Sequence, residues 1–130
     1  METPKLTVDA VIFDAGKIVL IKRVNPPFKD CWALPGGFVE VGETVEVACA
    51  REAKEETSLD VEVGRLVGVF SDPKRDSRGH TVSVAFLCRK NSGTLKGADD
   101  AKEARWFSIE ELPKLAFDHD KIVAAAKSII

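Results

Sequence analysis

The most informative stretch of the chain is Gly37–Leu59, GFVEVGETVEVACAREAKEETSL. Within it, Thr44 to about Thr57 is rich in Ala and Glu and free of Gly and Pro, which predicts a helix. Glu52, Glu55 and Glu56 fall within one sector of that helix, because successive residues turn by about 100°. Like charges at this spacing repel one another, and carboxylates in the last turn also oppose the helix dipole. A bound divalent cation that prefers oxygen ligands, Mg²⁺ or Mn²⁺, is the simplest explanation.

The acidic helix also has a second interpretation as a solvated face, since charge runs are usually exposed. The preceding Pro35-Gly36-Gly37 favours a built site instead, because glycines let the backbone approach a ligand closely. Arg51 is placed beside the acids, where it can brace them through ion pairs. The spacing therefore favours a metal site over a solvated helix.

Length and composition limit the class of protein. The 130 residues are 45% hydrophobic, enough for one core, so a single domain over residues 1–130 is expected. Lys+Arg number 19 and Asp+Glu 21, a net charge of -2, which argues against nucleic-acid binding through bulk charge. Apolar runs such as Val8–Phe13, which Asp9 breaks, fall far short of the roughly 20 residues that cross a membrane. The N-terminus lacks a signal-peptide core, so a cytoplasmic protein is expected. Three cysteines, odd in number and widely spaced, fit reduced thiols: Cys31, Cys49 and Cys88.

The order of predicted elements indicates an α+β fold with a mixed sheet. Strands come first, a helix lies in the middle of the chain, and helices close it. Ser108, with Glu111 three positions on, predicts a short helix that ends near Pro113. A terminal helix is expected from Asp118 or His119 to about Ile129. The expected strands are Leu6–Phe13, Ile18–Val24, Val61–Phe70, Thr81–Cys88 and Trp106-Phe107, with a short apolar piece at Phe38-Val39.

The helix and its flanks resemble the Nudix box, G-x5-E-x7-R-E-U-x-E-E-x-G-U. The likeness extends to Ile18–Arg23, Trp32–Gly37 and Arg105–Ser108, so it covers most of the chain. Ala53 replaces a bulkier aliphatic residue, and Ser58 replaces the second glycine. Because serine adopts a left-handed conformation less readily than glycine, the turn after the helix is expected to differ. The match includes the first glycine and every charged position of the box: Gly37, Glu43, Arg51, Glu52, Glu55 and Glu56.

The resemblance implies the Nudix fold, an α/β/α sandwich around a mixed β-sheet. It also implies hydrolysis of a nucleoside diphosphate linked to another group X, with Mg²⁺ as the cofactor and Mn²⁺ as a substitute. Carried over by position, the general base is Glu52 or Glu103, the latter beside the loop Gly97–Lys102. Glu43 and Arg51 would orient the other acids. The implied metal ligands are Glu52, Glu55, Glu56 and the carbonyl of Gly36.

Two candidate substrate contacts lie near the box. Arg23 ends a strand and is placed to bind a phosphate, the alternative being a solvated strand end. Trp32 could stack on a base, although a tryptophan beside an apolar strand is as often part of the core.

A third candidate region is Ser71–Ser83, SDPKRDSRGHTVS. It gathers Arg75, Arg78 and His80 in one loop, where guanidinium groups can bind phosphates or ribose hydroxyls. A solvated charged loop is the alternative. The segment is similar to the corresponding loop of ADP-ribose pyrophosphatases, as is Asp118-His119, whose histidine is equally a residue that starts a helix.

These likenesses favour one substrate class among several. The leading hypothesis is hydrolysis of ADP-ribose to AMP and ribose 5-phosphate by a homodimer. A nucleoside triphosphate pyrophosphohydrolase of the nucleotide-sanitising type is the first alternative, because similar boxes serve many substrates. A non-catalytic ADP-ribose-binding sensor is the second, although the intact acids count against it. No nucleic-acid or membrane partner is expected.

Overall fold

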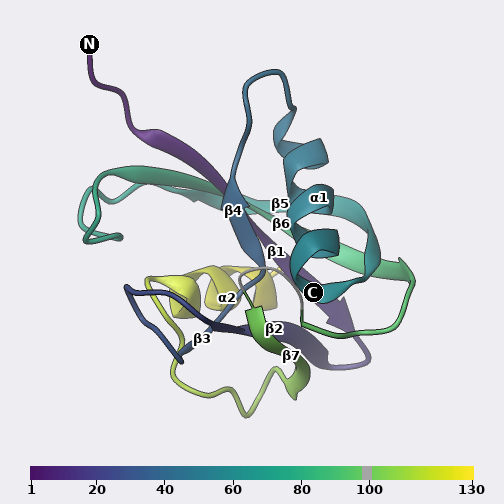
Figure 1. The fold of residues 1–130 in the computed structure, drawn as a ribbon. Helices are drawn as coiled ribbons and strands as arrows, with labels where there is room; N and C mark the ends of the chain where they lie inside the picture. Colours follow the sequence, from purple (N-terminus) through teal and green to yellow (C-terminus); the bar gives the residue numbers. More distant parts are fainter. Residues whose placement is uncertain (98–100) are drawn as a thin grey trace.

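The computed structural model describes residues 1–97 and 101–130 of the chain. The described residues form seven strands and two helices (Figure 1). Part of the loop Gly97–Lys102, residues 98–100, lies outside the described residues. The strands are β1 (Lys5–Asp14), β2 (Lys17–Arg23), β3 (Trp32–Ala33), β4 (Gly36–Phe38), β5 (Asp60–Phe70), β6 (Thr81–Ser92) and β7 (Ala101–Ser108), and the helices are α1 (Val45–Thr57) and α2 (His119–Lys127).

The strands form a mixed sheet around β1. β1 pairs in parallel with β6 along most of its length, from Lys5 opposite Thr81 to Ile12 opposite Cys88. On its other edge, β1 pairs antiparallel with β4 at its start and with β2 at its end. β2 in turn pairs with β3 and β7, and β5 pairs with β6. Because β1 changes partner along its length, β4, the strand that leads towards α1, lies beside the first half of β1.

Each face of the sheet carries one helix, which confirms the α/β/α sandwich. Side chains alternate along a strand, so Val8, Ala10 and Ile12 pack in the same buried cluster as residues of α1. Val11 points to the opposite face and joins the cluster that contains Ile122 of α2. The mixed sheet and the α+β class predicted from the sequence are both present.

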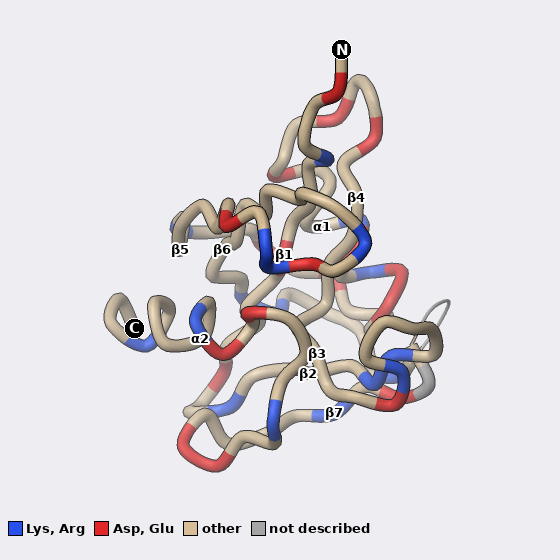
Figure 2. The backbone as a smooth tube through the Cα atoms, turned by 90° about the vertical axis from the view of Figure 1, so that its left-hand side faces the viewer, with Lys and Arg blue, Asp and Glu red and all other residues tan. Residues whose placement is uncertain are grey.

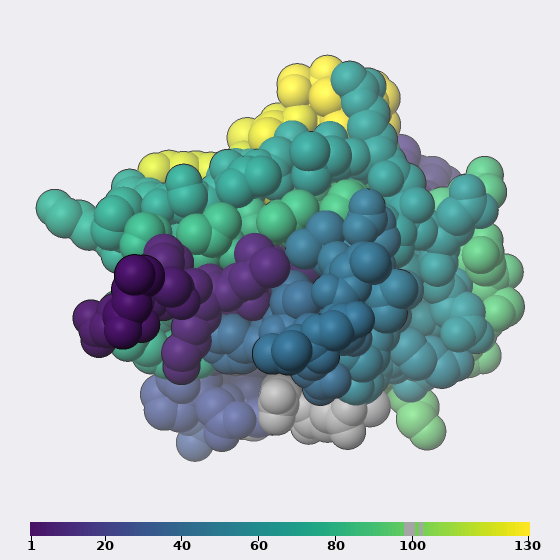
Figure 3. Space-filling model, turned by 90° about the horizontal axis from the view of Figure 1, so that it is seen from above, coloured from purple at the N-terminus to yellow at the C-terminus, as the bar shows by residue number. Residues whose placement is uncertain are grey.

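Two further views show the position of the N-terminus and the distribution of charged residues along the backbone. Seen from above, the N-terminal residues lie at the surface beside the β5–β6 hairpin, with the segment that leads into α1 next to them (Figure 3). Lys and Arg are interspersed with Asp and Glu over the elements, as Figure 2 shows. Neither described helix is long and apolar enough to cross a membrane. The cysteines are free thiols, as expected.

The predicted helix at Thr44 to Thr57 is confirmed. Thr44 is its N-cap, and the Thr44 hydroxyl accepts a hydrogen bond from Val47 N at 3.1 Å. Ser58 follows the helix with a φ of 66°, the left-handed conformation, so the expectation that serine would change this turn is wrong. The Ser58 N–H donates to Lys54 O at 3.0 Å, which satisfies one of the last helical carbonyls.

Two of the expected elements differ from the structure: within the described residues one expected helix is absent, and one expected strand is longer than predicted. Ser108 does not start a helix: it ends β7 opposite Lys17, and Ile109 N donates to Gly16 O at 2.9 Å. The capping-box pattern therefore closes only a turn, because sheet pairing holds its first residue extended. The strand expected at Trp106-Phe107 spans the whole of β7, because β2 offers a partner along that length.

Candidate active site

A cavity of about 410 Å³ opens between the start of β1, β4 and α1 on one side and the Ser71–Ser83 loop and the start of α2 on the other. Two groups of residues line it. The acidic group comes from β4 and α1: Gly36, Gly37, Arg51, Glu52, Glu55 and Glu56. The second group comes from segments far apart in the sequence, among them Asp9, Arg23, Asn25, Arg75, Asp76, Arg78, Phe117 and His119.

Arg51 organises the acidic group. Its Nε lies 2.7 Å from Glu43 Oε2, and its Nη1 lies 2.7 Å from Glu52 Oε1 and 3.2 Å from Glu55 Oε2. Nη2 donates to the carbonyl of Phe38 at 3.1 Å. Arg51 therefore braces the acids, as its position in the sequence predicts, and ties α1 to the end of β4.

The two acids that Arg51 holds most closely differ in their protonation. Hydrogen bonds from Arg51 and from the Glu40 backbone lower the pKa of Glu43 to about 2, so Glu43 is a permanent anion at neutral pH. Burial, together with a hydrogen bond with Glu55, raises the pKa of Glu52 to about 7. Glu52 thus titrates near neutral pH in the metal-free protein, where a divalent cation would compete with a proton for it.

The two glycines of β4 allow the acids to approach the backbone. Gly36 N donates to Glu56 Oε1 at 2.7 Å, and a side chain on Gly36 would collide with Val8 O and Asp9. A side chain on Gly37 would collide with the Glu52 carboxylate. The first glycine of the box is therefore required by contact with an acid of the same box, in addition to any backbone freedom.

The acidic group has the chemistry of a site for a hard divalent cation. Its donors are carboxylate oxygens and the Gly36 carbonyl, the oxygen ligands that hard divalent cations prefer, whereas the imidazole of His119 belongs to the second group of the same cavity. Glu52 and Glu55 are turned towards Arg51, and Glu56 receives the Gly36 amide. No three acidic, His or Cys side chains of the described residues converge on one point. The residues fit such a cation by their chemistry, and their side chains are held by Arg51 and Gly36.

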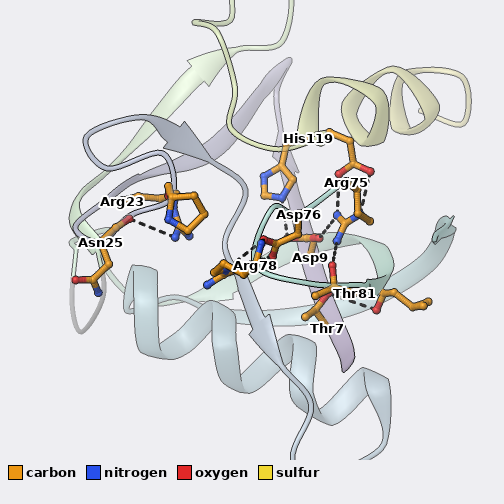
Figure 4. A network of polar contacts seen from close by, with 12 residues as sticks. Thr7, Asp9, Arg23, Asn25, Arg75, Asp76, Arg78, Thr81 and His119 are labelled. Carbon is orange, nitrogen blue, oxygen red and sulfur yellow. Dashed lines mark hydrogen bonds and ion pairs between the residues drawn. The ribbon is translucent and has the colours of Figure 1, made fainter. Parts of the chain in front are cut away.

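Part of the second group, around Asp9 and His119, forms a buried polar network (Figure 4). Asp9 and His119 are 6% and 5% exposed, and His119 Nε2 lies 3.4 Å from Asp9 Oδ1. Arg75 binds both oxygens of Asp118, at 2.7 and 2.9 Å, and donates to Thr81 Oγ1 at 2.7 Å. Burial raises the pKa of Asp9 and lowers that of His119, which favours the neutral imidazole.

Cationic and aromatic side chains stack at the edge of this network. The guanidinium of Arg23 lies 4.9 Å from the ring centre of Phe117, and that of Arg78 lies 5.7 Å from it. Arg23 Nε also donates to Pro27 O at 2.9 Å, which holds the loop after β2. The Arg78 side chain is 48% exposed and pairs with Asp76 at 2.8 Å. Arg78 therefore presents charge to the cavity while Asp76 holds its position.

The structure brings most of the predicted site residues together. Arg23, Arg75 and Arg78 line the cavity with the acids of α1. Trp32, His80 and Glu103 are not among the described residues that line it. Trp32 packs edge-on against Phe107, with ring centres 4.8 Å apart. His80 Nε2 lies 2.9 Å from Ser71 O, and Glu103 pairs with Arg105 and Lys22.

The cavity also contains residues that the sequence did not single out for the site, among them Asp9 and Phe117, and it contains His119, for which the sequence offered only the likeness of Asp118-His119 to ADP-ribose pyrophosphatases. A signal for Asp9 was present, since it is the one charge that breaks the apolar run Val8–Phe13. Phe117 carries no such local signal, and the likeness at Asp118-His119 is equally explained by an ordinary helix start.

The chain matches known families and relatives. A family model described as NUDIX domain matches residues 3–126. An ADP-ribose pyrophosphatase of Methanocaldococcus jannaschii is 58% identical over 120 residues, which are 92% of this chain and 71% of that protein. An ADPR responsive transcriptional repressor, NtrR, of Acinetobacter baylyi is 36% identical over 95% of this chain, which spans 53% of the repressor.

Solved structures share the fold. A bifunctional NMN adenylyltransferase/ADP ribose pyrophosphatase of Francisella tularensis, complexed with AMP and a Mn ion, superposes with a TM-score of 0.89 at 30% identity, covering 99% of this chain and 42% of that one. The NUDIX domain of Shewanella oneidensis NrtR, complexed with ADP ribose, has a TM-score of 0.84 at 27% identity, covering 99% of this chain and 90% of that one. With the box residues assembled at one cavity, these matches show that the chain belongs to the Nudix hydrolase family.

Proposed function

We propose that this protein hydrolyses the phosphoanhydride of ADP-ribose, releasing AMP and ribose 5-phosphate. One observation carries the proposal: the acids of α1, which could hold a cation, share a cavity with arginines from distant segments, which could bind phosphates. The 58% identity to a protein named ADP-ribose pyrophosphatase supports this choice of substrate.

The proposed metal is Mg²⁺, with Mn²⁺ as a substitute. Glu52, Glu55, Glu56 and the Gly36 carbonyl would hold it. When bound, such a cation lowers the pKa of a coordinated water and neutralises charge on the phosphates. The base would take a proton from the attacking water as the bond between phosphorus and the bridging oxygen breaks. Of the two candidates, Glu52 lines the cavity, whereas Glu103 pairs with Arg105.

The arginines would bind the substrate. The half-exposed Arg78 is placed to contact a phosphate or ribose hydroxyl, and Arg23 lines the same cavity. Arg75 also lines the cavity. Because its guanidinium group already binds Asp118 and Thr81, its main role would be to position these residues. Trp32 and His80 are weaker candidates for substrate binding, because they are not among the described residues that line the cavity. On the basis of the family resemblance, we also propose that the protein is a homodimer and is located in the cytoplasm.

The test is product analysis of ADP-ribose incubated with the purified protein and Mg²⁺, separated by ion-exchange chromatography. We expect AMP to appear with Mg²⁺ and not with EDTA. Glu56→Gln should reduce turnover by about a hundredfold or more, since it removes an ionised oxygen from the site. Glu46→Gln is the matched control, because Glu46 is exposed in the first turn of the same helix. Equal turnover by both variants would contradict the metal site.

A second candidate function is ADP-ribose binding without turnover. The 36% identity to an ADPR responsive repressor favours it. Calorimetry distinguishes the two functions: a sensor would bind ADP-ribose and Mg²⁺ with no release of AMP. If ADP-ribose is neither bound nor cleaved, nucleoside triphosphates are the next substrates to test.

A further inference from the structure

His119, the first residue of α2, joins two segments of the cavity wall. Leu34 N donates to His119 Nδ1 at 3.0 Å, so this ring nitrogen carries no proton. The proton of the neutral ring is therefore on Nε2, which lies 3.4 Å from Asp9 Oδ1. His119 therefore accepts a hydrogen bond from the backbone of Leu34, and its Nε2 faces the carboxylate of Asp9 on β1.

The segment that His119 holds is the one that delivers Gly36. Leu34 lies between β3 and β4, two residues before Gly36. The Pro35 carbonyl accepts a hydrogen bond from β1 at 2.8 Å, and Gly36 is the register partner of Asp9. Gly36 N then donates to Glu56 Oε1 at 2.7 Å. A shift of Leu34 is thus transmitted within two residues to the contact between Gly36 and Glu56.

The other partner of His119 is firmly anchored. Asp9 accepts a hydrogen bond from Ser83 on β6. Its Oδ2 also lies 4.0 Å from Arg75 Nη2, and Figure 4 shows these two side chains facing each other. Arg75 in turn binds the carboxylate of Asp118, the neighbour of His119. The imidazole is therefore held from both sides, and its Nδ1 is a fixed point for the Leu34 amide.

We propose that His119 is a positioning residue for the metal site: by accepting the Leu34 N–H, it places Gly36 against Glu56 and so sets the affinity for a divalent cation. This proposal rests on the proposed function in one respect only, namely that a divalent cation binds at the acids of α1. His119 needs no contact with substrate or metal for this role. It acts through the backbone of Leu34, Pro35 and Gly36.

Two substitutions separate the two hydrogen bonds of the ring. In His119→Asn the side-chain oxygen can take the place of Nδ1 and accept from Leu34, whereas in His119→Gln the amide nitrogen can take the place of Nε2 and donate to Asp9. Both remove the ring and both are polar, so loss of packing is common to the pair. Mn²⁺ affinity is measured by calorimetry without substrate, and amide exchange of Gly36 by NMR.

We expect His119→Asn to keep the Mn²⁺ dissociation constant within about threefold, and His119→Gln to raise it about tenfold. Exchange of the Gly36 amide should be faster in the Gln variant alone. If the two variants bind Mn²⁺ alike, or the Asn variant binds it more weakly, the proposal is overturned while ADP-ribose turnover by the native protein stands. A native protein that binds no Mn²⁺ overturns the proposed function, and equal Gly36 exchange in both variants then also refutes the role of His119.

Discussion

Replacing Glu52 by glutamine should stabilise the metal-free protein, and it should abolish the hydrolysis that is expected in the presence of Mg²⁺. Burial raises the pKa of Glu52 from its ordinary 4.5 to about 7, so the fold prefers the protonated acid. Between these values the native chain keeps a proton that the unfolded chain has released. The stability associated with this proton is therefore complete below pH 4.5 and is lost as the pH rises through about 7.

The size of this effect follows from the same two values. The interval from 4.5 to about 7, at about 1.4 kcal/mol per pH unit, corresponds to about 3.5 kcal/mol in the free energy of unfolding. Glutamine mimics the protonated acid, and its oxygen can still accept from Arg51. At pH 8 without metal, Glu52→Gln should unfold about 10 °C higher than the native protein, at roughly 3 °C per kcal/mol. Near pH 4.5 the two melting temperatures should converge.

Thermal unfolding by circular dichroism, with EDTA at pH 4.5 and pH 8, provides the measurement. Glu46→Gln is the control, and it should give no gain, because a negative charge in the first turn of a helix is favourable. Added Mn²⁺ should raise the melting temperature of the native protein and leave that of Glu52→Gln unchanged. A gain of the same size at both pH values, or no gain at pH 8, would refute the assignment of a proton to Glu52.

Three further substitutions test the site and its flanks. Gly37→Ala should weaken Mn²⁺ binding by about tenfold in calorimetry, because the methyl group displaces the Glu52 carboxylate; unchanged affinity would contradict that contact. Ser58→Gly should raise the free energy of unfolding in urea by up to about 1 kcal/mol, because it relieves a positive φ, and a loss of stability would show that the turn carries no strain. Arg78→Ala should raise KM for ADP-ribose about tenfold and KM for a nucleoside triphosphate less, with the exposed Arg89→Ala as control; equal changes for both substrates would exclude Arg78 from specificity.

Local patterns in the sequence predicted the acidic helix α1 well. The carboxylates of α1 and their brace, Arg51, lie within about two helical turns of one another, so the geometry of one helix places them together. The turn at Ser108 shows the limit of local patterns: the capping box was present, and pairing of β7 with β2 prevailed over it. At Ser58 the fold likewise kept a left-handed turn that serine disfavours.

The sequence by itself determined the family, the acidic helix and the oxygen donors of the proposed metal site, because these depend on spacing within one short stretch. Only the tertiary structure decided which distant residues face that helix. Asp9, Arg75 and His119 meet because β1 and β6 pair in parallel in one register and α2 begins beside them. Such contacts join residues from 9 to 119, and strand register and helix packing, rather than local spacing, bring them within hydrogen-bonding distance.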